Sequence, residues 1–272
     1  MDKYEFNPRS AFLRIRNHWQ DWAKQVGASK WVVGISGGKD STVVAALSMR
    51  AFGADNVLGV LMPNGVQTDI GDSISVCEHL GIRYVEINIE EAYESITRQT
   101  EIALDRLSYD TKTNLPARLR MSTLYAVAQT IGGFVVNTCN LSEDVVGYAT
   151  IWGDNAGSYA PIQGLTVTEI RQLGDWMELP HHLIHKTPVD GLQPLSDEDK
   201  LGFTYEALDR YIREDVGSDE FKAHINELYR KNKFKTDIVR IPGPNFYDLG
   251  NFVRYNNLPG VKGEVAAEEE ER

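Results

Sequence analysis

A glycine-rich turn follows the first apolar run of the chain, and its residues could bind phosphate. The residues that would form this cradle are Ser36, Gly37, Gly38, Lys39 and Ser41. Consecutive N–H groups of such a turn, together with the positive end of the helix that begins there, attract an anion. Asp40 should repel phosphate unless a divalent metal ion lies between the carboxylate and the phosphates. The turn therefore predicts a phosphate site that also holds Mg²⁺.

Spacing excludes two other phosphate-binding loops. The Walker loop requires Ser or Thr directly after Gly-Lys, whereas Asp40 follows Lys39, and Val33 occupies the position of the first Walker glycine. The dinucleotide fingerprint G-x-G-x-x-G fails because Ser36 stands where its second glycine should be. A generic glycine turn between a strand and a helix remains as the alternative without a ligand.

Residues 36–41 read Ser-Gly-Gly-Lys-Asp-Ser and resemble the loop of the ATP pyrophosphatases, enzymes that split ATP between its α and β phosphates. Further stretches resemble NAD synthetase within that superfamily, in the same order along the chain. These stretches are residues 62–67, 114–121, 137–144, 147–154 and 185–188. The resemblance implies an adenine nucleotide alpha hydrolase-like fold. It also implies a ligase that amidates deamido-NAD with ammonia and ATP, through a carboxyl–AMP intermediate, and releases AMP and pyrophosphate.

The resemblance also implies roles for individual residues. ATP and pyrophosphate would be bound by Ser36, Gly37, Gly38, Lys39, Ser41, Arg118 and Thr138. Catalysis would involve Asp40, Asp154 and Lys186, substrate binding would involve Arg120 and Lys235, and Mg²⁺ would be held by Asp40 and Glu143. Alternatives without a ligand-binding role stay open for several of these residues. Glu143 could be a first-turn residue of a helix capped by Ser142, the two arginines could lie on a solvated helix face, and Lys186 could be an exposed loop lysine.

Three positions depart from the family pattern. Val167 replaces a lysine, Ser158 replaces an aspartate, and Phe234 replaces the histidine of a C-terminal His-Lys pair. Lys186 is the leading candidate for the cation missing at Val167, and Lys233 and Lys235 are second choices. The departures leave open a nucleotide-binding sensor derived from the same fold. A separate rival function is that of another AMP-forming amidating pyrophosphatase.

The elements that must position these residues alternate between strands and helices. Short apolar runs predict strands at residues 31–35, 57–62, 84–89 and 133–138. Helical periodicity predicts helices at 8–26, 41–52, 70–80, 90–106, about 118–130, 167–178, 204–214 and 218–232, with a mobile polar loop at 106–117. Such alternation predicts an α/β fold, a doubly wound parallel sheet with helices on both faces, whose ligands lie beyond the carboxyl ends of the strands.

Composition limits the partners and the compartment. The 272-residue chain is 42% hydrophobic and carries a net charge of −11, which argues against broad binding to nucleic acid or to an anionic membrane. With only two cysteines, Cys77 and Cys139, we expect a reducing cytoplasm. Residues 1–260 are expected to form a single domain, and the acidic residues 261–272 a disordered tail. The resemblance implies a homodimer, to which the aromatic helix at 8–26 could contribute.

Overall fold

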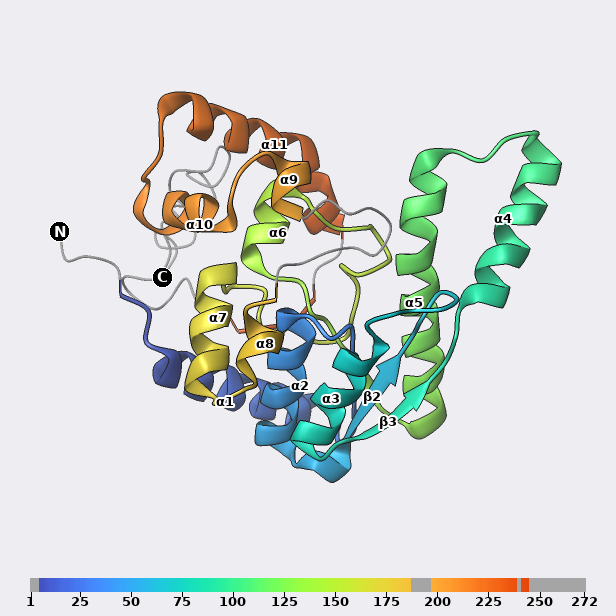
Figure 1. Cartoon of the computed structure of the whole chain (residues 1–272). Helices are drawn as coiled ribbons and strands as arrows, with labels where there is room; N and C mark the ends of the chain where they lie inside the picture. Colours follow the sequence, from blue (N-terminus) through green and yellow to red (C-terminus); the bar gives the residue numbers. More distant parts are fainter. Residues whose placement is uncertain (1–4, 187–196, 239–240, 245–272) are drawn as a thin grey trace.

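A computed structural model describes residues 5–186, 197–238 and 241–244, built around one small parallel sheet (Figure 1). Its four strands run in the order β3-β2-β1-β4. They are β1 (Trp31–Gly34), β2 (Val57–Leu61), β3 (Arg83–Glu86) and β4 (Phe134–Val136). Trp31 lies opposite both Val57 of β2 and Phe134 of β4, so the strands start at the same edge and end at the same edge. The predicted parallel sheet is confirmed.

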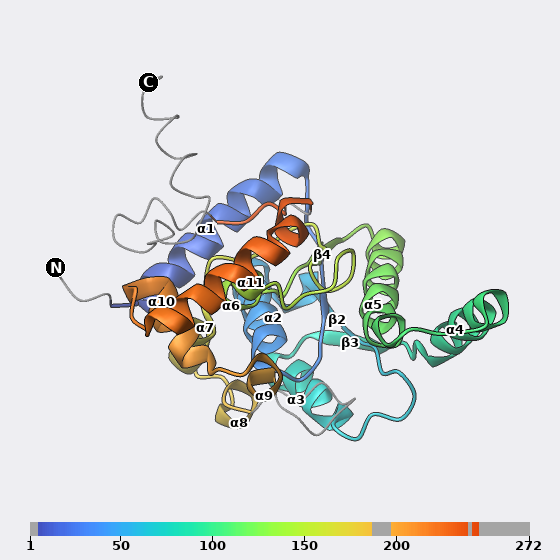
Figure 2. The ribbon, with the colours of Figure 1, turned by 90° about the horizontal axis from the view of Figure 1, so that it is seen from above.

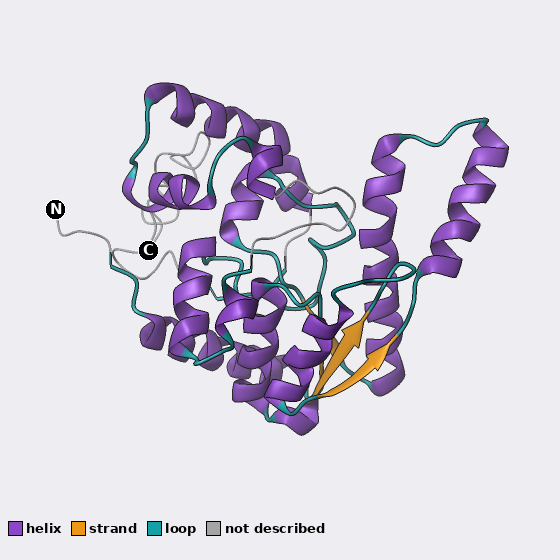
Figure 3. Cartoon of the chain, in the orientation of Figure 1, coloured by secondary structure: helices purple, strands orange, loops and turns teal. Residues whose placement is uncertain are grey.

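Helices cover both faces of the sheet, as Figure 3 shows. One face packs on α1 (Pro8–Val26), α2 (Lys39–Phe52), α3 (Ile70–Leu80), α7 (Val167–Trp176) and α8 (His181–Ile184). The other face packs on α5 (Tyr109–Ile131), which α4 (Glu90–Leu104) precedes. Side chains of β1 alternate between these layers, because Val33 joins the first core and Val32 the second. The polar segments that connect each strand to the next helix therefore lie at the carboxyl edge of the sheet.

A smaller apolar cluster lies beyond this edge. It joins α6 (Leu141–Val146) to α10 (Tyr205–Glu214) and α11 (Asp219–Ile238), and it includes Val167 at the start of α7. α9 (Asp197–Leu201) precedes α10. Figures 1 and 2 show α10 and α11 at one end of the molecule and the α4–α5 pair at the other. The carboxyl edge of the sheet lies between these two ends.

The aromatic face of α1 is internal. Trp19 is fully buried and packs on Trp31, Phe52 and Tyr159, with the ring of Tyr159 stacked at 4.7 Å. Asn7 caps the start of the helix, and Gly27 ends it in the left-handed conformation at φ 71°. The sequence left open whether this face packs on the body of the protein or on another subunit. The structure places it on the body.

The predicted mobile loop at 106–117 is wrong, because α5 begins at Tyr109. Ser108 caps it through the N–H of Thr111, and the side chains of Thr113 and Asn114 bond to carbonyls of the preceding turn. These polar side chains therefore satisfy the first turns of a helix rather than a loop, and Pro116 is accommodated inside it. α2 likewise begins at Lys39, two residues before the expected start. α6 is a helix that the predicted set did not include.

None of the helices within the described ranges is long and apolar enough to cross a membrane. Cys77 and Cys139 are both buried free thiols. The expected disordered tail at 261–272 and the end of the expected domain at residue 260 lie outside the described residues, as does most of the loop after Lys186.

The aromatic core yields a test of stability. Replacing Trp19 by Ala should lower the free energy of unfolding by about 3–5 kcal/mol, because a large buried side chain leaves a cavity. The indole N–H of Trp19 has no hydrogen-bond partner among the described residues, so the loss comes from packing alone. The matched control is Phe234→Ala, which removes an aromatic ring that is 51% exposed. Urea unfolding of both variants should separate them by at least about 2 kcal/mol.

Candidate active site

Residues 36–41, the predicted phosphate-binding turn and called the phosphate loop below, lie at the carboxyl end of β1, where the chain turns into α2. Gly37 adopts a φ of +77°, and a Cβ at this position would lie 2.8 Å from the Cβ of Asp72 in α3. Gly38 is the N-cap residue of α2. Because glycine has no side chain, the N-cap accepts no hydrogen bond from the first N–H groups of the helix through a side chain. The glycines thus bring backbone close to α3 and present a helix start of the kind that attracts an anion.

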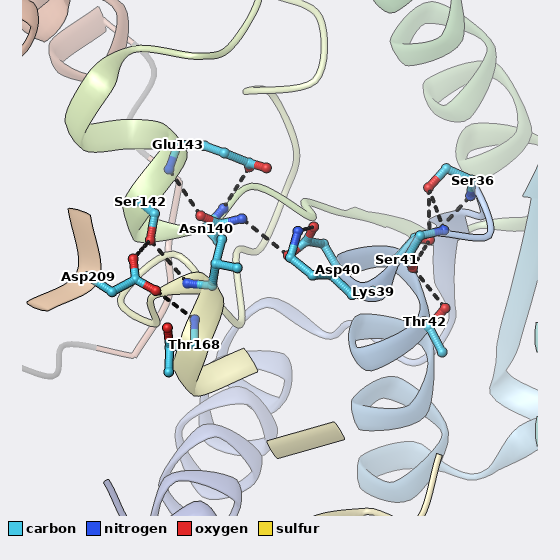
Figure 4. A network of polar contacts seen from close by, with 12 residues as sticks. Ser36, Lys39, Asp40, Ser41, Thr42, Asn140, Ser142, Glu143, Thr168 and Asp209 are labelled. Atoms are coloured by element: carbon cyan, nitrogen blue, oxygen red, sulfur yellow. Dashed lines mark hydrogen bonds and ion pairs between the residues drawn. The ribbon is translucent and has the colours of Figure 1, made fainter. Parts of the chain in front are cut away.

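The loop is held in shape by its own hydroxyls (Figure 4). Ser41 Oγ accepts the N–H of Ser36 at 3.2 Å and donates to the carbonyl of Gly38 at 3.1 Å. Thr42 Oγ1 donates to the same carbonyl at 2.8 Å. Because these bonds close within the turn itself, the loop is organised before any ligand arrives.

Lys39 and Asp40 form an ion pair at the first turn of α2. The Nζ of Lys39 lies 2.8 Å from Asp40 Oδ2, and Lys39 is only 5% exposed. Burial disfavours the charged ammonium, but Asp40 and Glu143 outweigh it, so the pKa of Lys39 is raised. The ammonium also lies 5.7 Å from the ring centre of Tyr205 in α10. A permanent cation therefore lies beside the phosphate loop, in contact with the C-terminal helices.

α6 brings a second carboxylate to Asp40. Asn140 caps the helix by accepting the N–H of Glu143 at 3.0 Å, and Glu143 accepts the N–H of Asn140 at 3.3 Å. The same Asn140 donates its side-chain amide to Asp40 Oδ1 at 3.2 Å. The cap is thus Asn140, and the open alternative that Ser142 caps this helix is wrong. Asn140 links the start of α6 to the start of α2.

Asp40 and Glu143 are suited to hold one divalent ion. Burial, and next the charge of Asp40, raise the pKa of Glu143 well above its ordinary range, while Lys39 opposes the rise. Two carboxylates that repel each other are stabilised by a cation between them. No group of three or more His, Cys, Asp or Glu in the described parts of the chain could hold a metal. Mg²⁺ usually takes only one or two carboxylates and completes its shell with phosphate oxygens and water, so the pair fits a metal that arrives with a nucleotide.

A second acidic group lies on the glycine-rich segment after α6. Asp154 Oδ1 accepts the N–H of Thr150 at 2.7 Å, and its carbonyl accepts the side-chain amide of Asn137 at 2.8 Å. Desolvation raises the pKa of the Asp154 carboxyl, although the N–H of Thr150 opposes the rise. Burial and then Asp154 raise the pKa of the neighbouring Asp144 to about 7. A carboxyl that titrates near neutrality can exchange a proton at working pH.

Lys235 of α11 holds this segment in place. Its Nζ donates to the carbonyls of Gly147 at 2.7 Å and Ala149 at 3.1 Å. Burial lowers the pKa of Lys235, although Asp154 opposes the change. Lys235, which the resemblance assigns to substrate binding, therefore contacts the glycine-rich segment, and its ammonium acts electrostatically on Asp154.

Lys186 lies on the α3 side of the loop. Its Nζ bonds to Asp69 Oδ2 at 2.9 Å and Asp72 Oδ2 at 2.6 Å. Burial tends to lower the pKa of Lys186, but the bonds to both aspartates raise it, and Lys186 in turn lowers the pKa of Asp69. Because Asp72 also touches Gly37, Lys186 lies one residue away from the phosphate loop.

The remaining predicted residues lie around the same edge. Arg120 donates from Nε to the carbonyl of Met62 at 2.9 Å, and burial lowers its pKa. Arg118 is exposed and donates to the carbonyl of Ile151 at 3.1 Å. Thr138 is half-buried in the chain that leaves β4. The arginines thus tie α5 to two loops of the carboxyl edge, after β2 and in the glycine-rich segment.

The departures have different surroundings. Val167 is fully buried in the apolar cluster of α10 and α11, Phe234 is half-exposed on α11, and the N–H of Ser158 bonds to the carbonyl of Val135. One turn after Val167, Arg171 acts electrostatically on Lys39, and its Nε is buried without a hydrogen-bond partner among the described residues. Arg171 is therefore a further candidate for the missing cation, since the ammonium of Lys186 already bonds to two aspartates.

Sequence reasoning missed several polar residues that organise the site. The capping signal at Asn140 and Glu143 was available from their spacing of three. Nothing local marks Asp209, which bonds to Ser142 across 67 residues of sequence, or Asp72, which bonds to Lys186 across 114. Only packing of distant elements reveals them.

Comparison with known proteins places this arrangement among related enzymes. The family model described as NAD synthase matches residues 12–239. The NH3-dependent NAD synthetase of Pyrococcus furiosus is 35% identical over 89% of this chain and 98% of its own length, and that of Pyrococcus horikoshii is 37% identical over 84% and 93%. Among solved structures, the NMN synthetase from Francisella tularensis has a TM-score of 0.79 at 30% identity and covers 88% of this chain and 99% of its own. The NH3-dependent NAD synthetase from Campylobacter jejuni has a TM-score of 0.71 at 27% identity, covering 87% and 99%.

The structure predicts that alanine at Gly37 and alanine at Gly71 change the free energy of unfolding in opposite directions. Gly37→Ala should lower the free energy of unfolding by at least about 1–2 kcal/mol, because a side chain at positive φ is strained and the new Cβ meets Asp72. Gly71→Ala in α3, where a Cβ meets nothing within 4 Å, should raise it by about 0.4–1 kcal/mol. Thermal unfolding measures both. Equal stabilities would contradict the observed loop conformation.

Proposed function

The chain belongs to the NAD synthase family, and we infer that it carries out NH3-dependent synthesis of NAD. It is an AMP-forming ligase that uses ATP to amidate the nicotinate carboxyl of deamido-NAD. The observation that carries this function is the meeting of the phosphate loop with Asp40, Lys39 and Glu143 at the carboxyl edge of the sheet. A nucleotide sensor would need the phosphate loop alone, without a pair of carboxylates to hold a metal against the phosphates.

The reaction needs two steps, because a carboxylate is inert to ammonia. The nicotinate oxygen attacks the α phosphorus of ATP, and the bond to the pyrophosphate breaks. Ammonia then attacks the carbonyl carbon, AMP leaves with the electron pair of the C–O bond, and the nitrogen loses a proton. The enzyme must therefore hold the pyrophosphate as charge grows on it, align the reactants and exclude water from the anhydride.

Residues of the site meet these demands. The loop residues Ser36, Gly37, Gly38, Lys39 and Ser41 bind the departing pyrophosphate, and Mg²⁺, held by Asp40 and Glu143, would neutralise charge on the phosphates. Asp154, whose pKa is raised by burial, accepts the proton that ammonia loses. Arg118 and Thr138 contact ATP, and Arg120 and Lys235 contact the dinucleotide. Lys186 supplies charge from the α3 side, and Arg171 supplies the cation that Val167 lacks.

The function is tested by following ATP with the purified chain. With deamido-NAD and ammonium, we expect NAD, AMP and pyrophosphate in equal amounts and no ADP. Because only neutral ammonia is nucleophilic, the rate at a fixed total of ammonium should rise with pH. Glutamine in place of ammonium should give no NAD. Intact ATP binding without AMP formation would favour the sensor instead.

A second candidate function is amidation of the mononucleotide counterpart. It is favoured by the similarity to the NMN synthetase from Francisella tularensis, whose structure superposes on this chain with a TM-score of 0.79. Both substrates present the same nicotinate carboxyl and differ by the adenylate half of the dinucleotide. Competing the two acids in one reaction, and measuring NMN against NAD, decides between them. A ratio of specificity constants above one for the mononucleotide would replace the first proposal.

The chain also carries a surface suited to a second copy of itself. Strand β3 is an edge strand with all four residues exposed, and α4 buries none of its residues within the described chain. Several apolar side chains of this edge and of the α4–α5 pair beside it are exposed, namely Tyr84, Val85, Ile96, Ile102, Leu104, Tyr109 and Tyr125. Such an apolar surface beside an open edge favours a protein contact. We place the homodimer interface here, rather than on α1, whose aromatic face is internal.

The cytoplasm is the compartment in which we expect the enzyme to work.

The metal assignment predicts a loss of activity without a loss of fold. Glu143→Gln and Asp40→Asn should each lower turnover by about 100- to 1,000-fold and raise the Mg²⁺ concentration needed for half the rate, because each removes a charge that faces the metal and the phosphates. The matched control is Asp55→Asn, an exposed aspartate in the turn that precedes β2. Near-normal turnover of either site variant would contradict the assignment.

The proposed interface predicts a change of mass in solution. Ile102 and Leu104 are 69% and 64% exposed, and replacing both by Glu should place charges in the contact and yield monomers by light scattering. Val216→Glu, at a residue that is 39% exposed between α10 and α11, at the other end of the molecule, should leave the dimer intact. A dimer that survives the double change would move the interface elsewhere.

A further inference from the structure

A buried carboxylate on α10 reaches the helix that carries Glu143. Asp209 is 4% exposed, and its Oδ1 accepts the hydroxyl of Ser142 at 2.5 Å while its Oδ2 accepts the N–H of Thr168 at 2.7 Å (Figure 4). Ser142 is itself fully buried and immediately precedes Glu143. Its Oγ also accepts the N–H of Val167 at 3.0 Å. One carboxylate therefore joins three helices, α6, α7 and α10.

This network fixes the direction of the Ser142 hydroxyl. The oxygen accepts from Val167, so its hydrogen must point to Asp209, which offers only acceptor oxygens when ionised. Burial raises the pKa of Asp209, and the bonds that Ser142 and Thr168 donate to the charged form limit this rise. The start of α7 adds partial positive charge at the same point. Replacing the carboxylate by an amide would put an N–H opposite either a donor hydroxyl or a backbone N–H.

α10 is held in register against α7 by a separate buried pair. Arg213 lies one turn after Asp209, and its guanidinium bonds to both carboxylate oxygens of Glu169 at 2.6 Å. The same guanidinium donates to the carbonyl of Gly164 at 2.7 Å. This pair joins α10 to α7, whereas the bond between Asp209 and Ser142 joins α10 to the start of α6.

The start of α6 is where the proposed metal pair is assembled. Asn140 and Glu143 cap each other there, and Asn140 holds Asp40. Ser142 lies between them in sequence, so a shift of Ser142 would move both Asn140 and Glu143 relative to Asp40. We propose that Asp209 is a positioning residue, which acts through Ser142 to hold Glu143 at the distance from Asp40 that the metal requires. This inference rests on the proposed function only in its assignment of the metal to Glu143 and Asp40.

The test compares metal binding in full-length variants. Asp209→Asn and Ser142→Ala should each weaken the binding of Mn²⁺, used as a spectroscopic probe of the Mg²⁺ site in the presence of ATP, by about tenfold, as partners of metal ligands typically do. The Mg²⁺ concentration for half the rate should rise in parallel, while the KM for ammonium stays within about twofold. The double variant should bind Mn²⁺ no more weakly than either single one, because both changes break one connection.

A matched control and a second variant keep the outcomes distinct. Tyr211→Phe removes a hydroxyl on the same helix that bonds to Asn226 of α11 at 2.9 Å, so it should leave Mn²⁺ binding unchanged. If Asp209→Asn does not fold, Ser142→Ala carries the test alone. Lower melting temperatures with wild-type Mn²⁺ affinity would overturn the proposal and leave Asp209 a purely structural residue. Absence of turnover in the unaltered chain would overturn the proposed reaction instead, since the comparison of Mn²⁺ affinities does not depend on it.

Discussion

Repulsion between Asp40 and Glu143 is the constraint on which the rest of the site depends. Two carboxylates that face each other away from bulk water are unfavourable unless a cation and hydrogen-bond donors surround them. The chain supplies Lys39, buried at 5% exposure beside Asp40, and Asn140, whose amide donates to the same carboxylate. The negative charge of the two carboxylates that remains uncompensated is the charge that a metal bound to phosphates would neutralise. The repulsion within the pair would therefore be relieved by a nucleotide that brings its metal to this site.

The surroundings of this pair are built from elements far apart in the sequence. The turn after β1 contributes Lys39 and Asp40, and the helix after β4 contributes Asn140 and Glu143. The two strands are neighbours in the sheet, so their carboxyl ends deliver both groups to one edge. Behind them α10 contributes Tyr205 under Lys39 and Asp209 against Ser142. Two residues of α10 therefore contact the segments that carry the charged groups of the candidate site.

The two ends of the molecule serve different purposes in this arrangement. At one end, α10 and α11 pack on α6 and hold the glycine-rich segment through Lys235 (Figure 2). At the other end, the α4–α5 pair leaves an apolar surface uncovered next to the open edge of β3. Arg118 and Arg120 extend from α5 toward the segments around the active edge. A partner bound to the α4–α5 end would thus lie next to the helix that carries both arginines.

Local sequence determined the parallel sheet, the phosphate loop and the family. Continuous apolar runs predict buried strands, and the loop motif at residues 36–41 depends on neighbouring residues alone, so both follow from short stretches. Local signals also misled where side chains bond to backbone, as at the start of α5, because Ser, Thr and Asn favour turns and helix starts equally. Asp209, Asp72 and the internal position of the α1 aromatics came only from the tertiary structure. Their roles depend on which distant elements they meet, and a buried carboxylate has the same sequence appearance as an exposed one until its donors are in place.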